Sequence, residues 1–186
     1  MDNKTTYIKF FTGVNPKTIK VLMQTVEQKL KEGTKRFVIL ISSPGGNVSA
    51  GVSAYNFLKG IPVEVITCNF GDAHSIAVIL FCAGSKRLCA PHARFLLHGI
   101  GFNVTAPTRF DEHTLDERIK GLKLDRETIA SIIADSIGGK KKVKDVDRDI
   151  LSNTVLNSQQ AVDYGLVHEI KTELFPKGAE IISITD

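Results

Sequence analysis

The sequence predicts an α/β fold in which strands and helices alternate along most of the chain. One observation is the apolar, β-branched run at residues 37–41, which has strand length and suits a parallel strand covered on both faces. A second is the helical spacing of the apolar residues between Pro16 and Gly33. Such alternation favours right-handed crossovers within a mainly parallel sheet. With 186 residues and no evident linker or repeat, residues 1–186 are expected to form one domain.

The bounds of each expected helix and strand come from capping and breaking residues at its ends, or from the period of its apolar residues. Asn15 is a favoured N-cap, Pro16 suits the first helical position, and Gly33 ends that helix. Near the other end of the chain, Ser158 is expected to cap a short helix that Gly165 stops. The expected order is strand 7–11, helix 16–32, strand 37–41, loop 43–47, helix 48–58, strand 63–67, an apolar helix from Ser75 to near Gly84, strands 87–90 and 94–97, helix 111–137, helix 158–164, and strands 167–170 and 180–184.

The composition is that of an ordinary soluble globular protein, with 42% hydrophobic and 24% charged residues and a net charge of +4. The basic run at residues 140–144 has no interleaved aromatic residues, so we interpret it as a solvated turn and expect no nucleic-acid partner. No apolar run approaches the length of a membrane span. The odd number of cysteines, their lack of zinc-motif spacing and the polar N-terminus predict reduced thiols in a cytoplasmic protein. No Walker A loop is present, so we expect the chain not to hydrolyse nucleotide itself, and any ATP use would fall to a separate ATPase. We expect no cofactor and no metal.

The most informative stretch is the small-residue turn at residues 71–77, which contains Ser75. An apolar strand precedes it and an apolar helix follows it. A hydroxyl at that junction lies beside backbone N–H groups that have no partner within the helix. These are conditions that a nucleophile and its oxyanion need, although serine is also a common N-cap.

Five motifs in order resemble the proteolytic subunit family of the Clp protease, within the wider fold group that also holds the crotonases. The resemblance runs from about Tyr7 to Ile170. The motifs are Ser-Pro-Gly-Gly-Asn-Val at 43–48, Gly-Asp-Ala-His-Ser at 71–75, Ala-Gly-Ser-Lys-Arg at 83–87, Arg-Phe-Leu-Leu-His at 94–98, and Asp-Arg-Asp at 147–149 followed by Gln-Ala-Val-Asp-Tyr-Gly-Leu-Val at 160–167. The resemblance implies the ββα superhelix of the ClpP/crotonase fold with a protruding strand–helix handle at about residues 99–137.

The resemblance also implies a Ser-His-Asp triad. Ser75 would be the nucleophile, His98 the base and Asp149 the orienting acid. His98 is favoured over the other histidines because it ends an expected strand. Asp149 directly precedes Ile150, which would anchor it on the core. The rival residues are His74, His92, His113 and His168 for the base, and Asp145 and Asp147 for the acid.

The oxyanion donors implied by the resemblance are backbone N–H groups. One belongs to Ile76, and the other to a glycine of the 43–48 loop, with Gly45 preferred over Gly46. Two glycines after a strand suit N–H groups that must approach a substrate closely, because no Cβ obstructs them. A plain turn would explain the same pair of glycines.

The handle predicts self-association. Helix 111–137 has more apolar stripe than one small domain readily covers, which indicates burial against another chain. In the family, such handles join two rings of seven subunits around enclosed active sites. The resemblance therefore implies rings, possibly stacked heptamers, a peptide or unfolded protein as substrate, and an AAA+ unfoldase as a possible partner.

The sequence departs from the family pattern at several places. His74 stands where a small residue is usual, and Gly99 and Ile100 follow His98 where the family has a proline at the second position. The chain begins close to its first strand, which predicts short or missing pore loops. Residues 171–186 exceed the usual ending, and we expect them to form an extra edge strand or a subunit contact.

The function expected from all of this is a serine endopeptidase that works inside an oligomeric chamber. One alternative is a non-catalytic ring subunit, which His74 and the short N-terminus leave open. Another is a crotonase-type acyl-CoA enzyme on the same fold, although that chemistry uses no serine nucleophile. A weaker alternative is a relative that clips membrane proteins or matures phage proteins without an ATPase.

Overall fold

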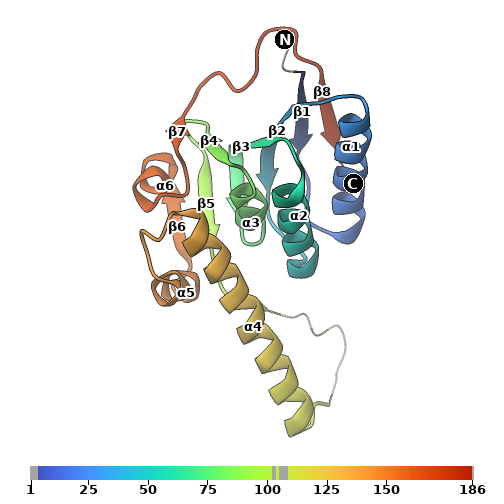
Figure 1. Cartoon of the computed structure of the whole chain (residues 1–186). Coiled ribbons are helices and arrows are strands. Elements are labelled where there is room, and N and C mark those ends of the chain that lie inside the picture. Colours follow the sequence, from blue (N-terminus) through green and yellow to red (C-terminus); the bar gives the residue numbers. More distant parts are fainter. Residues whose placement is uncertain (1–3, 102–103, 105–108, 186) are drawn as a thin grey trace.

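The computed structural model describes residues 4–101, 104 and 109–185, and it has the expected α/β architecture (Figure 1). The strands form one sheet in the order β6-β5-β3-β2-β1-β8, with β4 paired to β3 and β7 paired to β4. Every described strand pair is parallel except β5 with β6. The strands are β1 (Thr5–Phe10), β2 (Arg36–Ser43), β3 (Glu64–His74), β4 (Lys86–Cys89), β5 (Arg94–Leu97), β6 (Thr154–Asn157), β7 (Glu169–Ile170) and β8 (Ile181–Ile184).

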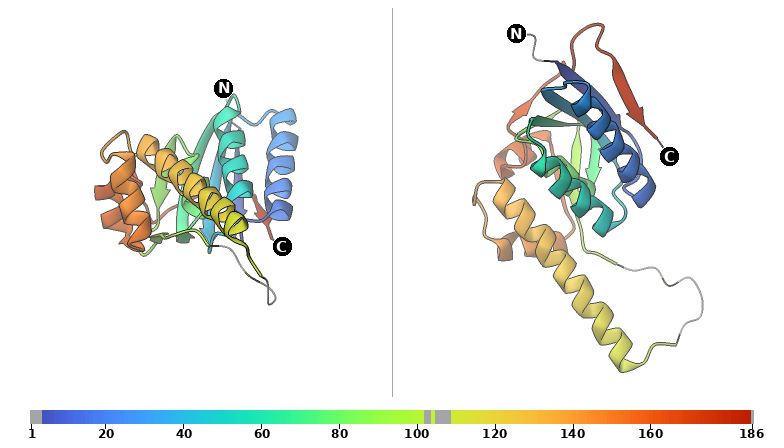
Figure 2. Two further views of the ribbon diagram at one scale, coloured as in Figure 1. Left: turned by 90° about the horizontal axis from the view of Figure 1, so that it is seen from below. Right: turned by 45° about the vertical axis from the view of Figure 1, so that its right-hand side comes forward.

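Helices α1 and α2 lie side by side over one face of the sheet, and α4 extends away from it (Figure 2). Asn15 caps α1 as predicted, and Gly165 ends α6 in the left-handed conformation at φ 93°. The helices are α1 (Pro16–Lys31), α2 (Val48–Gly60), α3 (Ala77–Cys82), α4 (Glu112–Ser136), α5 (Val143–Leu151) and α6 (Ser158–Tyr164).

The local structure differs from the sequence predictions in several places. Helix α5 and strand β6 were not predicted, and α5 begins inside the basic run that was interpreted as a turn. The cap of α6 is Asn157, whose side chain accepts a hydrogen bond from the Gln160 N–H. The Ser158 hydroxyl lies instead within hydrogen-bond distance of carbonyls of the β4–β5 loop, including that of Ala93.

Strand β3 changes partners along its length, and this change positions the site. Its register against β2 shifts between the pairs Ile41–Asn69 and Ser43–Ala73, so β3 carries extra residues there. Before the shift β3 pairs with β4, and after it with β5. Side chains hold the irregularity: the Asn69 amide donates to the Arg94 carbonyl at 2.8 Å, and the Ser42 hydroxyl accepts from the Asp72 N–H at 3.3 Å.

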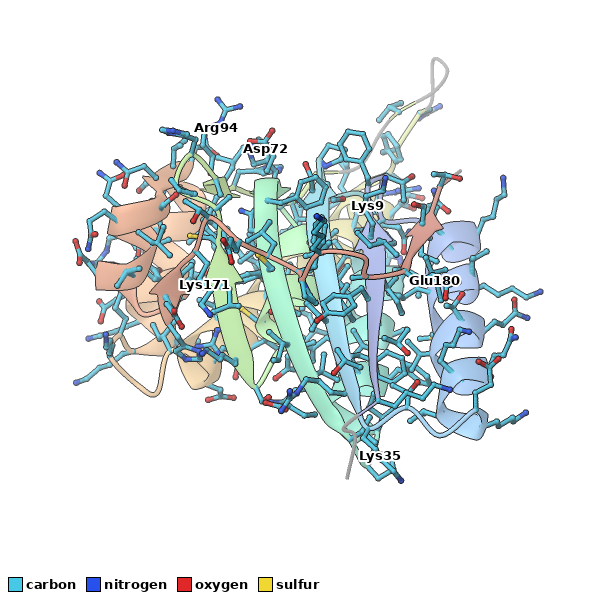
Figure 3. All side chains as sticks on the ribbon, turned by 90° about the horizontal axis from the view of Figure 1, so that it is seen from above. Lys9, Lys35, Asp72, Arg94, Lys171 and Glu180 are labelled. Carbon is cyan, nitrogen blue, oxygen red and sulfur yellow. The ribbon has the colours of Figure 1, made fainter. Side chains whose placement is uncertain are left out.

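The residues beyond the expected end of the family pattern cross the second face of the sheet. The connection from Lys171 to Glu180 passes over the strands (Figure 3) and ends in β8, which pairs with β1 in parallel. Leu174 and Ile181 from this segment pack on a small apolar cluster that includes Val38 and Leu40. The expectation of an extra edge strand is therefore confirmed.

Helix α4 is buried only toward its C-terminal end, at Ile129, Ala130, Ile133 and Ala134. Its N-terminal half projects from the sheet (Figure 1) and exposes apolar side chains. These exposed residues are Leu115, Ile119 and Leu124. The strand of the expected handle falls partly on residues 102–103 and 105–108, which lie outside the described residues.

A buried guanidinium joins α4 to the rest of the fold. Arg87 donates to the carbonyls of Leu166 at 2.6 Å and Ser136 at 2.7 Å, and also to those of Gly84 and Gly165. Burial lowers the pKa of Arg87. Because these carbonyls come from separate elements, Arg87 fixes where α4 leaves the domain.

Among the described residues, no helix combines the length and the apolar character that crossing a membrane requires.

Candidate active site

Ser75 sits at the end of β3 in a backbone conformation that few residues adopt. Its φ is +57°, in the left-handed region that disfavours side chains other than glycine and asparagine. The Ser75 N–H donates to the Leu96 carbonyl of β5 at 2.8 Å, which fixes the turn against its neighbour strand. Ser75 was expected in the first turn of the following helix. This expectation was wrong, because helix α3 begins at Ala77 and Ser75 precedes it. A strained serine between a strand and a buried helix is the arrangement found at nucleophile turns.

The glycine loop lies directly against this serine. A Cβ built on Gly45 would stand 2.7 Å from Ser75 Cβ and 2.6 Å from the His74 carbonyl oxygen, so only glycine fits. The loop is held by Val14, whose N–H donates to the Gly45 carbonyl at 2.8 Å and whose carbonyl accepts from the Asn47 N–H at 2.7 Å.

The backbone N–H groups around Ser75 differ in how they are used. The Gly45 N–H donates to the Ser43 hydroxyl at 3.2 Å. Within the described part of the chain, neither the Gly46 N–H nor the Ile76 N–H has a hydrogen-bond acceptor. These two groups remain available to a ligand, whereas the preferred glycine of the sequence analysis already has a partner.

His98 follows β5 immediately and is half-buried. Leu96 of β5 pairs with His74 of β3, and the Leu96 carbonyl accepts a hydrogen bond from the Ser75 N–H. His98 follows Leu96 by two residues, at the end of β5 that lies beside the serine. The structure thus brings the Ser75 and His98 backbones to one end of neighbouring strands, the carboxyl end of both.

The other histidines have different surroundings. His74 Nε2 lies 3.3 Å from Asp72 Oδ1, and Arg94 Nε lies 3.1 Å from the same oxygen (Figure 3 labels Asp72 and Arg94). His168 contacts Arg87, and burial lowers its pKa. His92 and His113 are exposed.

Asp149 lies on α5 and its carboxylate is already engaged. Its Oδ2 accepts hydrogen bonds from Lys141 Nζ at 2.6 Å and from the Tyr164 hydroxyl at 2.7 Å. Lys141 Nζ also stacks over the Tyr164 ring, 4.3 Å from its centroid. Burial, followed by the bond to Asp149, raises the pKa of Tyr164. The structure gives Asp149 these partners and no hydrogen bond to His98.

Asn153 was not considered as a site residue from the sequence, yet it lies beside the end of β5 that leads into His98. Strands β5 and β6 are antiparallel, and their last pair is Leu97 with Thr154. The next residues along the chain are His98 after β5 and Asn153 before β6, so these two residues flank the last pair at the same end of the two strands. Asn153 has φ +52° and its N–H donates to the Ile150 carbonyl, which ends α5. No local pattern in the sequence distinguishes Asn153 from other polar residues near that helix end.

The thiols are poor candidates for nucleophiles. All three cysteines are buried, and burial raises the pKa of Cys68 to about 12 and that of Cys82 to about 11. Across residues 4–101, 104 and 109–185, no three His, Cys, Asp or Glu side chains cluster as metal ligands would.

Comparison with known proteins places this chain in a family. The family model described as Clp protease matches residues 4–173. The ATP-dependent Clp protease proteolytic subunit 1 of Leifsonia xyli subsp. xyli is 34% identical over 145 residues, which cover 75% of this chain and 70% of that protein. The protein of the same description from Tropheryma whipplei (strain Twist) is 29% identical over 153 residues, covering 81% of this chain and 72% of that one.

The fold agrees with this result. A solved structure of a ClpP1 mutant from Listeria monocytogenes superimposes with a TM-score of 0.79 at 22% identity, covering 92% of this chain and 93% of that one. The match of the family model over nearly the whole chain, with the relatives named as proteolytic subunits, shows that this chain belongs to the Clp protease family.

Proposed function

We propose that this chain is a serine endopeptidase in which Ser75 attacks the scissile carbonyl and His98 accepts the serine proton. The observation that carries the proposal is the strained Ser75, fixed by its 2.8 Å bond to β5, the strand that leads into His98. An acyl-enzyme would form on Ser75, and water activated by His98 would release it.

The oxyanion that develops during the attack would be bound by backbone N–H groups. The Gly46 and Ile76 N–H groups are the better pair, because the Gly45 N–H already donates to Ser43. One such donor contributes about 3–4 kcal/mol to the barrier reduction. A peptide substrate would lie extended beside the glycine loop and pair through its backbone.

Asp149 is the orienting acid that the family resemblance assigns. Its Oδ2 is engaged by Lys141 and Tyr164, which leaves Oδ1 as the oxygen that would have to accept from His98. This engagement is also the observation that favours the second candidate function, a ring subunit without activity of its own.

The exposed apolar side chains of α4 support self-association into rings, with stacked heptamers as the arrangement that the family resemblance implies. Leu124 is 64% exposed and Ile119 is 45% exposed, which is unfavourable unless another chain covers them. We propose a cytoplasmic assembly without a cofactor of its own, in which any use of ATP falls to a partner unfoldase. Native mass measurement of the full chain and of Leu124→Arg tests this part, and a mass unchanged by the substitution would count against it.

The catalytic proposal is tested with a fluorophosphonate probe and a short fluorogenic peptide. Ser75→Ala should abolish both labelling and hydrolysis, while the circular dichroism spectrum stays that of the native fold. Ser53→Ala is the matched control, because Ser53 is exposed on α2 and bonds only its own helix, and it should be labelled like the wild type. Labelling that survives Ser75→Ala would disprove the nucleophile, and a wild type that no probe labels would favour the non-catalytic subunit.

A further inference from the structure

We propose that the side-chain amide of Asn153, not a carboxylate, orients the His98 imidazole. This inference rests on the proposed function of His98 as the base. It assigns the third position of the site to a residue that the sequence motifs passed over, and it makes Asn153 a positioning residue.

The strand register carries the argument. Four consecutive pairs join β5 to β6, from Arg94 with Asn157 to Leu97 with Thr154. Residues directly opposite in an antiparallel pair have Cα atoms about 4.5–5.5 Å apart. This spacing applies to the last pair, Leu97 with Thr154. His98 and Asn153 are each bonded directly to a member of that pair, so the Asn153 side chain starts near the imidazole.

The backbone at Asn153 is held from both sides. Its N–H donates to the Ile150 carbonyl at 3.2 Å, and the hydroxyl of its neighbour Thr154 donates to the Asp149 carbonyl at 2.8 Å. These two bonds fix the point at which α5 turns into β6. The exposed Asn153 side chain therefore projects from a rigid position and not from a free loop.

Asp149 lies one helical turn earlier in the chain and already accepts hydrogen bonds from other residues. Its Oδ2 accepts from both Lys141 and Tyr164, which ties α5 to the segment before it and to α6. A side chain used in this way stabilises the packing of the helices. Removing it from that contact would leave the hydroxyl of the buried Tyr164 without its acceptor.

The chemistry of an amide fits the task of orientation but not that of charge stabilisation. The Asn153 Oδ1 would accept the His98 Nδ1–H and so leave Nε2 as the acceptor of the serine proton. An asparagine serves in this position in papain-like proteases. The amide carries no charge, so it stabilises the imidazolium less than a carboxylate would.

The left-handed backbone at Asn153 requires a control, because asparagine is also a common residue at helix ends. Asn153→Gly keeps a residue that tolerates φ +52° and removes only the amide. Asn153→Asp keeps the size of the side chain and adds the charge. Asp149→Asn removes the charge that the family motif would assign to the site.

The experiment measures two quantities on the full chain: the rate of fluorophosphonate labelling, and the titration midpoint of the His98 ring protons by NMR, assigned with His98→Gln. Asn153→Asp should speed labelling at least tenfold, within the ~10⁴-fold range known for exchanging these two residues in a triad. It should also move the His98 midpoint about one unit to higher pH, because an adjacent carboxylate favours the imidazolium. Asn153→Gly should slow labelling without unfolding the chain, and Asp149→Asn should leave the midpoint in place.

The inference is overturned if Asn153→Asp changes neither quantity, or if Asp149→Asn lowers the midpoint as loss of a triad carboxylate would. The two proposals fail separately. A midpoint that moves in Asn153→Asp without any Ser75-dependent labelling keeps the Asn153–His98 contact and rejects the peptidase. If labelling depends on Ser75 but its rate is unchanged in both Asn153 variants, the peptidase proposal stands and the contact between Asn153 and His98 is disproved.

Discussion

Replacing Gly45 by alanine should disable the site by pushing Ser75 out of place. The added Cβ would lie 2.6 Å from the His74 carbonyl oxygen and 2.7 Å from Ser75 Cβ. Ordinary contacts begin at 3.4 Å, so the backbone on one side must move by 3.4 − 2.6 = 0.8 Å. A displacement near 1 Å costs about 100-fold in rate when the displaced group is the one that reacts.

Gly33 separates this effect from backbone strain. Gly33 and Gly45 share the same φ of +89°, but a Cβ on Gly33 would meet nothing within 4 Å. Gly33→Ala should therefore cost only the left-handed penalty, about 1–2 kcal/mol. In a chain of this size, that cost lowers the melting temperature by about 2–8 °C.

The assay compares both variants with the wild type by fluorophosphonate labelling and by thermal unfolding. Gly45→Ala should lose about 100-fold in labelling rate and more stability than Gly33→Ala, which should be labelled normally. Equal labelling of Gly45→Ala and wild type would refute the reasoning, and so would an equal loss in both variants, because strain alone would then explain it.

Three further predictions concern the frame around the site. Native Cys68 and Cys82 should resist iodoacetamide at pH 8. Burial raises the pKa of Cys68 from 9.0 to about 12, so between pH 9 and 12 the thiol ionises in the unfolded chain and thereby favours unfolding. Cys68→Ala should therefore reduce the loss of stability over that pH range. Arg87→Met should cost about 2–4 kcal/mol in urea unfolding, because four carbonyls lose their donor, and a cost below 1 kcal/mol would contradict its role in holding α4. Ile184→Ala should lower the free energy of unfolding by about 2–3 kcal/mol, because this β8 side chain is 1% exposed. The control Val155→Ala, at a side chain that is 59% exposed, should change it by less than about 0.5 kcal/mol. Equal effects would mean that β8 does not pack on the sheet in solution.

Elements with strong local signals could be predicted from the sequence. The cap at Asn15, the apolar run in β2 and the glycine that ends α6 each act over a few residues, and each led to the right element. Helix α5 and strand β6 lack such signals. β6 is four residues long and mostly exposed, so its pairing with β5 stabilises it more than its own residues do.

The candidate site, like the fold, was predictable only where local signals mark its residues. His98 stands at a strand end that the sequence marks. Ser75 was expected in the first turn of a helix after a strand ending at residue 67, but β3 runs on to His74 and brings the serine beside β5. The third position was not predictable, since Asp149 and Asn153 are both polar and both lie within a few residues of Ile150. The choice of glycine for the oxyanion was equally open, because the bond from the Gly45 N–H to Ser43 depends on how the loop folds.

By itself, the sequence determined the α/β alternation, the strand-to-helix turn that carries Ser75, and the glycines that lie against it, because these depend on backbone preferences and on the period of apolar residues. Only the tertiary structure decided which partners the Asp149 carboxylate takes, which amides beside Ser75 are left unbonded, and where residues 171–185 run. Those outcomes depend on strand register and on competition among hydrogen-bond partners far apart in the chain, and no local preference encodes either of them.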